Sequence, residues 1–337
     1  MRIAIATDAW QPQINGVVRT LGQTVAHLKE LGHEVRLVTP QEFRTYPCPT
    51  YPSIRLAVFP KQGVTRMLRE FRPQAIHIAT EGPIGHAAHA VCRSLSLPFT
   101  TSYHTQFPEY VRARFPLPVS WSYAYLRGYH SRATRTMIAT PSMRRMLEDR
   151  GFKNLAIWAR GVDSNLFQPG PKSFLSGPRP ISMYMGRVAV EKNIEAFLDL
   201  DLPGSKYVVG DGPDLEPLRR RYPNVTFTGQ KTGQELTAHL AAADVFVFPS
   251  LTDTFGLVLL EAMACGVPVA AFPVTGPIDV VQHGKTGVLD TDLRKAILGA
   301  LKLDPADCVA YARQHSWRNW TERFASLLEP FEERRWG

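Results

Sequence analysis

Two carboxylates and a glycine are spaced so that together they could bind a sugar phosphate. Asp253 and Glu261 are eight positions apart, and Gly256 lies between them. Residues 257–264 have helix-forming composition, so Glu261 is expected about one and a half turns into a helix. The turn before this helix presents backbone N–H groups and the positive end of the helix dipole, which attract phosphate, while carboxylates accept hydrogen bonds from sugar hydroxyls. The spacing therefore predicts a nucleotide-sugar site.

Apolar runs on both sides of this turn place it at the edge of a sheet. Residues 245–248 (VFVF) and 267–272 (VPVAAF) are β-rich and predict buried parallel strands, and ligands of open sheets bind at the carboxyl ends of such strands. A second strand–helix series begins at 181–185 (ISMYM), and this strand is followed by Arg187 and Lys192. A guanidinium and an ammonium can neutralise a diphosphate as it departs.

The segment 252–262 (TDTFGLVLLEA) resembles the acidic-x7-Glu signature of retaining glycosyltransferases of family 4, which have the GT-B fold. The family usually has Glu as the first acid, whereas this chain has Asp253, whose carboxylate sits one methylene further back. Segments 184–195 (YMGRVAVEKNIE), 102–106 (SYHTQ) and 8–21 (DAWQPQINGVVRTL) are also similar to the family. The resemblance implies an α/β protein of GT-B architecture, with two Rossmann-like, doubly wound parallel-sheet domains facing across a cleft.

The resemblance also implies a division of the chain into three parts. Residues 1–168 are expected to form an acceptor-binding domain, and a segment rich in Pro and Gly follows it. Residues 169–315 are expected to bind the nucleotide sugar. Residues 316–337 begin with an amphipathic helix that is expected to cross back to the first domain.

Each residue of the site has a role that the resemblance implies. Arg187 and Lys192 stabilise the departing diphosphate. Glu261 holds ribose hydroxyls, and Asp253 holds hydroxyls of the transferred sugar. His104 faces the donor hexose across the cleft. The expected catalytic residues are His104, Arg187, Lys192 and Asp253, and the expected donor-binding residues are Gly16, Gly212, Gln230, Lys231, Thr254, Phe255, Gly256, Leu257, Val258 and Glu261.

No DxD motif or cluster of Cys and His is placed in the sequence like a metal site. The two cations and the helix dipole are therefore expected to stabilise the diphosphate in place of Mg²⁺, and we expect neither a metal nor another cofactor.

A stretch at 107–135 interleaves aromatic residues with arginines and contains one acid. Tyr and Trp favour the headgroup level of a bilayer, and Arg there is attracted to anionic lipid. We expect this stretch to dock on the membrane and admit a lipid acceptor, or else to be a helix whose aromatics pack in the core while its arginines are solvated. The residues expected at the membrane or acceptor are Arg112, Arg114, Trp121, Tyr125 and Arg127.

The basic charge of this 337-residue chain lies in its first half. Residues 1–168 contain 21 of the 39 Lys and Arg but 10 of the 30 Asp and Glu, which suits an anionic membrane surface. No apolar run approaches the roughly 18 residues of a membrane span. A strand is expected at residues 2–7, so no secretory leader is expected, and the four Cys are scattered like reduced thiols. These features predict a cytoplasmic protein associated peripherally with the inner face of the plasma membrane.

The most specific expectation is transfer of a hexose from UDP-glucose or UDP-glucuronate to a lipid such as diacylglycerol. A GDP-mannose-dependent alpha-mannosyltransferase is the first alternative, and a GT-B nucleotide-sugar epimerase is the second. A nucleic-acid binder would explain the basic half, but the sequence contains no recognisable recognition helix or aromatic RNA motif. A dinucleotide enzyme would need GxGxxG after the first strand, where residues 8–16 contain one Gly.

Overall fold

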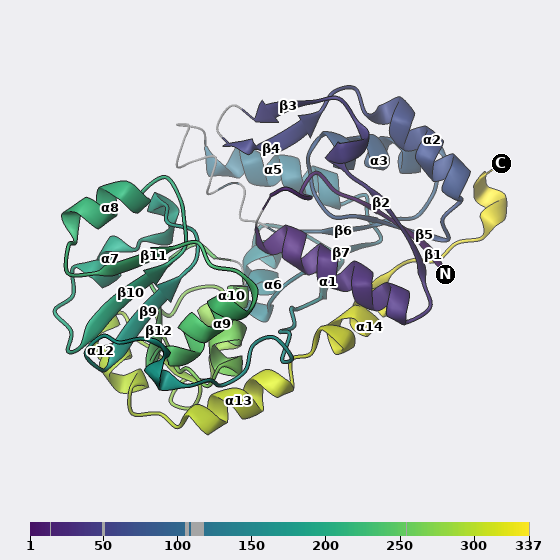
Figure 1. The fold of residues 1–337 in the computed structure, drawn as a ribbon. Helices are drawn as coiled ribbons and strands as arrows, with labels where there is room; N and C mark the ends of the chain where they lie inside the picture. The colour runs from purple at the N-terminus through teal and green to yellow at the C-terminus, as the bar shows by residue number, and fades with distance from the viewer. Residues whose placement is uncertain (14, 49–50, 105–107, 109–117, 254, 337) are drawn as a thin grey trace. The chain divides into compact units, whose positions relative to one another are not determined.

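The computed structural model describes residues 1–13, 15–48, 51–104, 108, 118–253 and 255–336 (Figure 1). The chain forms two compact units. Unit 1 is Met1–Ala159 together with Trp317–Gly337, and unit 2 is Arg160–Ser316. Each unit contains a six-stranded parallel sheet. Unit 2 therefore begins ahead of the segment rich in Pro and Gly, and the C-terminal tail belongs to unit 1.

The sheet of unit 1 has the strand order β2-β1-β5-β6-β7-β8, and every neighbouring pair is parallel. The chain winds from β1 outward to one edge and then from β5 to the other. The central strands β1 and β5 are buried almost throughout, as expected of parallel strands covered on both faces. The strands are β1 (Arg2–Ala6), β2 (Glu34–Val38), β5 (Ala75–Ile78), β6 (Thr100–Ser102), β7 (Arg135–Ile138) and β8 (Leu155–Ile157).

Helices cover both faces of this sheet. On one face, α1 (Gly16–Glu30) and α14 (Trp317–Leu327) contact each other and pack on Ile3 and Ile5. On the other face, Ala4 and Ala6 join a core with residues of three helices, α2 (Lys61–Phe71), α3 (Pro83–Ser94) and α5 (Val119–His130). A further helix, α6 (Pro141–Glu148), packs with Tyr103 and Ile138. Alternate residues of β1 therefore serve two separate cores.

The sequence of residues 41–66 is rich in Pro and predicts an irregular segment with one strand over 54–59, but the structure contains more than that. They form an antiparallel hairpin of β3 (Thr45–Cys48) and β4 (Tyr51–Ala57) and the first turns of α2. The apolar residues Val64, Met67 and Leu68 are buried on one side of α2 at helical spacing. The many prolines before Lys61 obscured this pattern in the sequence.

The sheet of unit 2 has the strand order β11-β10-β9-β12-β13-β14 and is also parallel throughout. The chain starts at β9, moves outward through β10 to β11, and returns to the other side of β9 with β12. The strands are β9 (Ile181–Met185), β10 (Ser205–Val209), β11 (Thr226–Gly229), β12 (Val245–Phe248), β13 (Val269–Ala271) and β14 (Gly287–Leu289).

Two sets of helices enclose the sheet of unit 2. Buried residues of α7 (Glu195–Leu198), α8 (Leu215–Arg221) and α12 (Leu293–Ala300) share one core with the sheet. On its other side, α9 (Gly233–Ala242) contacts β9, and α10 (Leu257–Ala264) contacts β12 and β13. Unit 2 also contains α11 (Pro277–Val280) and α13 (Pro305–Arg313). The described residues include the 3-10 turns η1 (Pro40–Glu42), η2 (Lys172–Phe174), η3 (Val190–Lys192) and η4 (Glu333–Trp336).

Candidate active site

The reversal of strand order in unit 2 lies between β9 and β12, and most of the expected catalytic residues follow these two strands. In an open α/β sheet, the loops that leave the carboxyl ends of two such strands diverge and create a crevice for a ligand. The loop after β9 carries Arg187 and Lys192, and the loop after β12 carries Asp253. The topology therefore brings together cations and a carboxylate that are about 60 positions apart in the sequence.

Lys192 and Asp253 form a direct ion pair. The Nζ atom of Lys192 lies 2.8 Å from both carboxylate oxygens of Asp253, and the two side chains are 21% and 20% exposed. The neighbouring Asn193 has a left-handed backbone, and its amide donates a 3.0 Å hydrogen bond to the carbonyl of Pro249. Both loops are thus fixed at this point. Glu195, the nearest acid after Lys192 in the sequence, pairs with Arg221.

Arg187 follows the end of β9, in the same loop as Lys192. Its Nη1 is 3.9 Å from Glu191 Oε1, and its carbonyl accepts a 2.7 Å hydrogen bond from the hydroxyl of Tyr184. Burial raises the pKa of Tyr184 well above its usual value, and the negative charges of Asp253 and Glu191 raise it further. Tyr184 therefore stays a neutral donor that holds the loop backbone.

The loop after β10 touches the loop after β9 backbone to backbone. A Cβ on Gly212 would lie 2.1 Å from the carbonyl oxygen of Val188, which no side chain can tolerate. The amide of Val188 in turn donates a 2.9 Å hydrogen bond to the carbonyl of Asp211. Gly212 is therefore required for this loop to approach the β9 loop.

The N-terminus of α10 follows Asp253 at the same edge of the sheet. Gly256 is its N-cap, with φ +77°, and within the described part of the chain no side chain caps the helix. The N–H groups of Leu257 and Val258 lie in this first turn, where a phosphate is stabilised by the helix dipole. Phe255 is buried beneath the turn. Thr254 lies outside the described residues.

Glu261 lies further along α10 and is 4% exposed. Its negative charge adds to the burial that raises the pKa of the Cys265 thiol to about 12. A buried carboxylate at this depth is suited to accept hydrogen bonds from sugar hydroxyls, because they replace the water it has lost.

Gln230 and Lys231 follow the edge strand β11. Strand β10 lies between β11 and β9, the strand that leads to Lys192. Lys231 forms a 2.5 Å ion pair with Glu235 in the first turn of α9, and this hydrogen bond lowers the pKa of Glu235. Gln230 is exposed. Among the described contacts, none joins these two residues to Lys192 or Asp253.

Two family models match the chain. Residues 14–166 match the model described as Glycosyltransferase Family 4, and residues 179–302 match that described as Glycosyl transferases group 1. A GDP-mannose-dependent alpha-mannosyltransferase of Corynebacterium glutamicum is 31% identical over 316 residues, which span 86% of this chain and 76% of that protein. The chain belongs to glycosyltransferase family 4.

The names of other relatives of this glycosyltransferase indicate different substrates. The sulfoquinovosyl transferase SQD2 of Arabidopsis thaliana is 34% identical across 82% of this chain and 61% of that protein. The alpha-monoglucosyldiacylglycerol synthase of Streptococcus pneumoniae is 27% identical across 90% of this chain and 79% of that protein. The sucrose-phosphate synthase of Thermosynechococcus elongatus shares the fold, with a TM-score of 0.74, 22% identity and coverage of 97% and 98% of the two chains. The predictions of a glycosyltransferase and of an α/β GT-B fold are confirmed.

Unit 1 of the glycosyltransferase carries two residues expected at the donor site. Gly16 is the first residue of α1, where the side chain of Asn15 accepts hydrogen bonds from the amides of Val17 and Val18. His104 follows β6, and its ring meets the edge of the Trp158 ring with centroids 5.8 Å apart. These facts give the places of Gly16 and His104 within unit 1, and their roles stay predictions.

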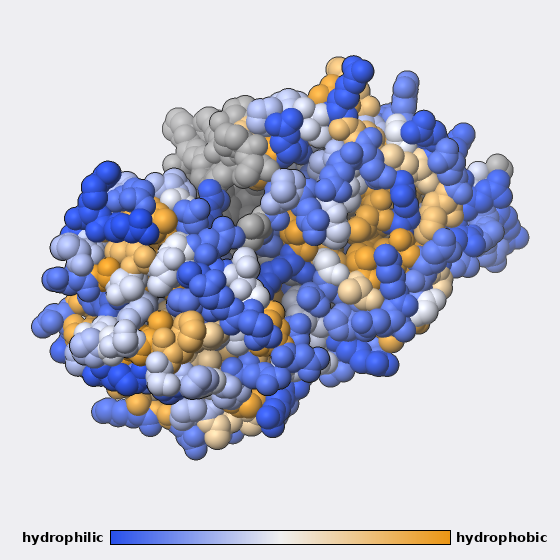
Figure 2. Space-filling view, in the orientation of Figure 1, coloured by the Kyte–Doolittle hydropathy of each residue, from blue (hydrophilic) through white to orange (hydrophobic). Residues whose placement is uncertain are grey.

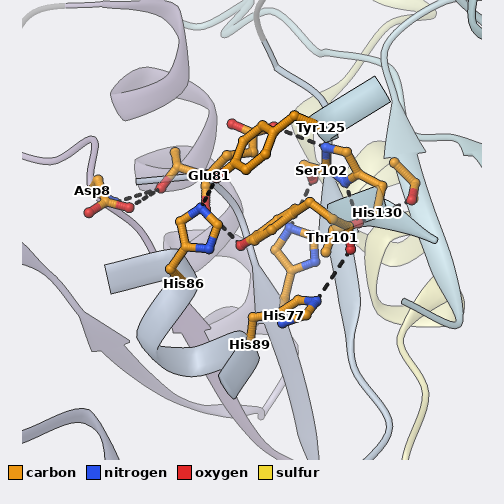
Figure 3. Close-up of polar contacts among 12 residues, drawn as sticks. Asp8, His77, Glu81, His86, His89, Thr101, Ser102, Tyr125 and His130 are labelled. Atoms are coloured by element: carbon orange, nitrogen blue, oxygen red, sulfur yellow. Dashed lines mark hydrogen bonds and ion pairs between the residues drawn. The ribbon is translucent and has the colours of Figure 1, made fainter. Parts of the chain in front are cut away.

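The reversal of strand order in unit 1 holds a polar cluster that the sequence analysis did not identify (Figure 3). Asp8 follows β1, and its carboxylate accepts hydrogen bonds from the Thr80 hydroxyl (2.8 Å) and from the amides of Ile84 (2.8 Å) and Gly85 (3.2 Å). Asp8 therefore occupies the N-terminus of α3. Burial raises its pKa, and Glu81 adds to this effect. The feature of the sequence that could have predicted this cluster is Asp8 itself, an acid directly after a buried strand.

Glu81 follows β5 and extends this cluster toward α5. Its Oε1 lies 3.1 Å from Nε2 of His130, whose Nδ1 lies 2.9 Å from the hydroxyl of Thr101 (Figure 3). His86 of α3 contacts the hydroxyl of Tyr125, and burial lowers the pKa of this histidine. The cluster joins α3 and α5 at the carboxyl edge of the sheet.

The aromatic and basic residues of α5 divide between core and surface. Tyr123 and Tyr129 are buried, whereas Trp121 is 69% and Tyr125 is 56% exposed. Arg127 donates a 2.9 Å hydrogen bond to the carbonyl of Arg150. The expected packing of aromatics in the core therefore holds for Tyr123 and Tyr129, and docking on a membrane stays a prediction. Arg112 and Arg114 lie outside the described residues, and no helix in the described ranges is long and apolar enough to span a bilayer.

Proposed function

We propose that this glycosyltransferase moves a hexose from a nucleoside-diphosphate sugar to a lipid acceptor such as diacylglycerol, with retention of the anomeric configuration. The observation that carries the proposal is the Lys192–Asp253 pair, which lies at the reversal of strand order beside the N-terminus of α10. A sugar diphosphate needs both charges there, because cations and amides bind its phosphates while carboxylates bind its hydroxyls.

In this proposal the donor spans the loops after β9 and β12. The diphosphate contacts Arg187 and the amides of Leu257 and Val258. An ammonium has three donors, so Lys192 can hold Asp253 and a phosphate oxygen at once. Asp253 then binds hydroxyls of the transferred hexose, and Glu261 binds the ribose. The fixed positions of Lys192 and Asp253 reduce the reorganisation needed as charge develops on the leaving diphosphate.

We further propose that no metal ion takes part, since Arg187, Lys192 and the α10 dipole supply the positive charge that Mg²⁺ supplies elsewhere. Transfer is expected to be unchanged after incubation with EDTA. Loss of activity that Mg²⁺ or Mn²⁺ restores would contradict this part of the proposal.

The proposed reaction proceeds on one face of the sugar. The bond between the anomeric carbon and the diphosphate oxygen breaks, the acceptor oxygen attacks from the same side, and the leaving phosphate takes the proton of the acceptor hydroxyl. The proton coupling constant at the anomeric carbon of the product, measured by NMR, would distinguish retention from inversion.

An uncharged acceptor is supported by the cluster at the reversal of strand order in unit 1. The α3 amides that could bind an acceptor phosphate already bind Asp8, and Glu81 adds a second negative charge beside them. An anionic headgroup would be repelled there, whereas hydroxyls of glycerol or a sugar can donate to Glu81. Diacylglycerol, which appears in the names of two relatives, fits this chemistry.

One assay tests the proposal. The purified protein is incubated with UDP-glucose, UDP-glucuronate, UDP-galactose or GDP-mannose and with diacylglycerol vesicles, and the lipid product is identified by mass spectrometry. A lipid product formed with GDP-mannose but with none of the three UDP-sugars would favour the first alternative, a mannosyltransferase like that of Corynebacterium glutamicum. Isomerisation of a donor without acceptor would favour an epimerase and contradict transfer.

For a lipid acceptor, we also propose that the enzyme associates peripherally with the inner face of the plasma membrane. The exposed rings of Trp121 and Tyr125 support this, because such rings favour the headgroup level. Substitution of Arg112, Arg114 and Arg127 by Glu is expected to weaken binding to anionic vesicles. Unchanged binding of that triple variant would contradict a role for this stretch.

A further inference from the structure

The turn between β4 and α2 in unit 1 exposes an aromatic residue in a strained backbone conformation. Phe59 is 94% exposed and has φ +47°, a left-handed conformation that is rare for bulky residues. Beside it, Val58 is 39% exposed. Neither burial nor local backbone preference explains an aromatic residue at this position, and strain of this kind often marks a functional surface.

The outer face of the β3–β4 hairpin continues this apolar surface. Tyr46 lies opposite Leu56 in the register and is 47% exposed, and the amide of Val58 bonds to the carbonyl of Arg44 at 2.9 Å. Residues paired across an antiparallel ladder point to the same face, so Arg44, Tyr46 and Val58 share one side. The opposite side carries Ala57, which is buried in the core of unit 1.

The charges around this surface are almost all positive. Residues 43–69 contain five Lys or Arg and no Asp or Glu. Three of these cations, Lys61, Arg66 and Arg69, are exposed along α2, and the acid that follows them, Glu70, lies 3.8 Å from Arg66. Figure 2 shows hydrophobic side chains among hydrophilic ones at the top of the view, over the turn that joins β4 and α2.

We propose that this surface, which we call the apolar–basic edge (Arg44, Tyr46, Val58, Phe59, Lys61, Arg66 and Arg69), binds an anionic phospholipid bilayer. It includes none of the exposed rings of α5. An aromatic side chain that projects from the backbone can enter the headgroup region, while surrounding cations attract anionic lipid over a Debye length. The inference rests on the proposed lipid acceptor, because a bilayer is where such an acceptor resides.

Replacement of Phe59 by Gly separates membrane binding from folding. Gly adopts positive φ without strain, so Phe59→Gly is expected to raise the thermal midpoint of unit 1 by a few degrees, about 2–4 °C. In cosedimentation with vesicles of phosphatidylcholine and phosphatidylglycerol, the same variant is expected to bind about tenfold more weakly. Phe59→Leu keeps an apolar side chain and is expected to bind nearly as wild type. Phe174→Gly, an exposed aromatic of unit 2, is the matched control and is expected to leave binding unchanged.

The charge of the edge is tested with the same vesicles. Substitution of Lys61, Arg66 and Arg69 by Glu should abolish the preference for phosphatidylglycerol over pure phosphatidylcholine. Substitution of Arg294, Lys295 and Lys302 by Glu in unit 2 makes the same change of charge and should leave this preference unchanged. Wild-type vesicle binding by Phe59→Gly, or loss of binding in Trp121→Ser but not in Phe59→Gly, would overturn the proposal.

Activity separates this proposal from the proposed function. Phe59→Gly should transfer hexose to diacylglycerol in detergent micelles at the wild-type rate, but more slowly to diacylglycerol in anionic vesicles. If the wild type binds vesicles through Phe59 but glycosylates no lipid in micelles or in vesicles, the proposed function fails and the proposal for the apolar–basic edge stands. If it glycosylates diacylglycerol and vesicle binding does not depend on Phe59, the edge fails and the function stands.

Discussion

Lys192 holds Asp253 symmetrically, with its ammonium nitrogen 2.8 Å from each carboxylate oxygen, and this contact joins the loops that leave β9 and β12. Both side chains are mostly but not fully buried. In the proposed reaction, the pair would set the spacing between a cation for the phosphates and a carboxylate for the sugar before any donor binds. Preorganisation of this kind lowers the barrier, because the groups do not need to move as charge develops.

Replacement of Lys192 by Ala is expected to lower kcat/KM by about 100-fold or more, because in the proposed reaction it removes a charge that faces the leaving group and releases Asp253. Asp253→Asn should have an effect of similar size, and the double variant should lose less than the product of the two single losses. Initial rates with saturating acceptor measure kcat/KM for each variant. Glu195→Gln, the neighbouring acid that pairs with Arg221, is the control and should be active. Near-wild-type turnover in Lys192→Ala would remove this residue from the site.

Glu261→Gln is expected to weaken nucleotide binding by about tenfold or more, because an amide accepts weaker hydrogen bonds from ribose hydroxyls than a carboxylate does. Titration calorimetry with UDP and GDP measures the change and also identifies the base. Because Glu261 is buried, thermal unfolding of the ligand-free variant checks that the substitution leaves the fold intact. Equal affinity of variant and wild type would exclude Glu261 from the ribose site.

Gly256→Ala and Gly284→Ala form a matched pair of backbone variants. Both residues have φ +77°, so either Ala is expected to cost about 1–2 kcal/mol of the free energy of unfolding. A Cβ at Gly284 meets open space, whereas at Gly256 it lies 3.0 Å from Cδ1 of Leu259, at the turn that would bind the diphosphate. Only Gly256→Ala should therefore weaken donor binding, by about tenfold. Equal donor affinity of the two variants would show that the α10 turn does not contact the phosphates.

The sequence predicted unit 2 more accurately than unit 1. Buried parallel strands are continuous apolar runs, so β9 and β12 were located to the residue, and α10 likewise. The hairpin β3–β4 was missed in part because its prolines and polar residues contain no such run. The pattern of α2 was missed because only three of its residues are buried.

Candidate residues were predictable where one short segment contains the whole motif. Gly256 and Glu261 belong to a single strand–turn–helix unit, so spacing alone placed them. The contact of Lys192 with Asp253, and that of Asp8 with Thr80, join residues 61 and 72 positions apart. Such contacts depend on which strands become neighbours, and no local periodicity encodes that choice.

Asp8→Ala is expected to lower the free energy of unfolding of unit 1 by about 1–3 kcal/mol, because it leaves the amides of Ile84 and Gly85 and the Thr80 hydroxyl without their acceptor. Urea unfolding followed by circular dichroism measures this. Asp149→Ala, at an exposed position after α6, is the control. An unchanged midpoint in Asp8→Ala would show that water replaces the carboxylate without cost.

Burial makes three of the four thiols poor nucleophiles in the native protein. The pKa values of Cys92, Cys265 and Cys308 are each raised to about 12, with desolvation as the main cause, while Cys48 lies half-buried in β3. At pH 8 a thiol of pKa about 12 is ionised roughly a thousandfold less than one of pKa about 9. An aromatic disulfide reagent such as DTNB should therefore modify at most one thiol rapidly, and Cys48→Ser should remove that phase.

The same shifts have a consequence for stability at high pH. Since the folded pKa of each buried thiol exceeds its unfolded value, the stability linked to these thiols is fully present below pH 9 and is lost as the pH rises toward 12. Replacement of all three by Ala should make the free energy of unfolding less dependent on pH in this range, as measured by urea unfolding at successive pH values. Tyr222, whose pKa is also raised to about 12, should contribute part of the remaining dependence. Rapid modification of two or more thiols at pH 8 would contradict the burial on which this prediction depends.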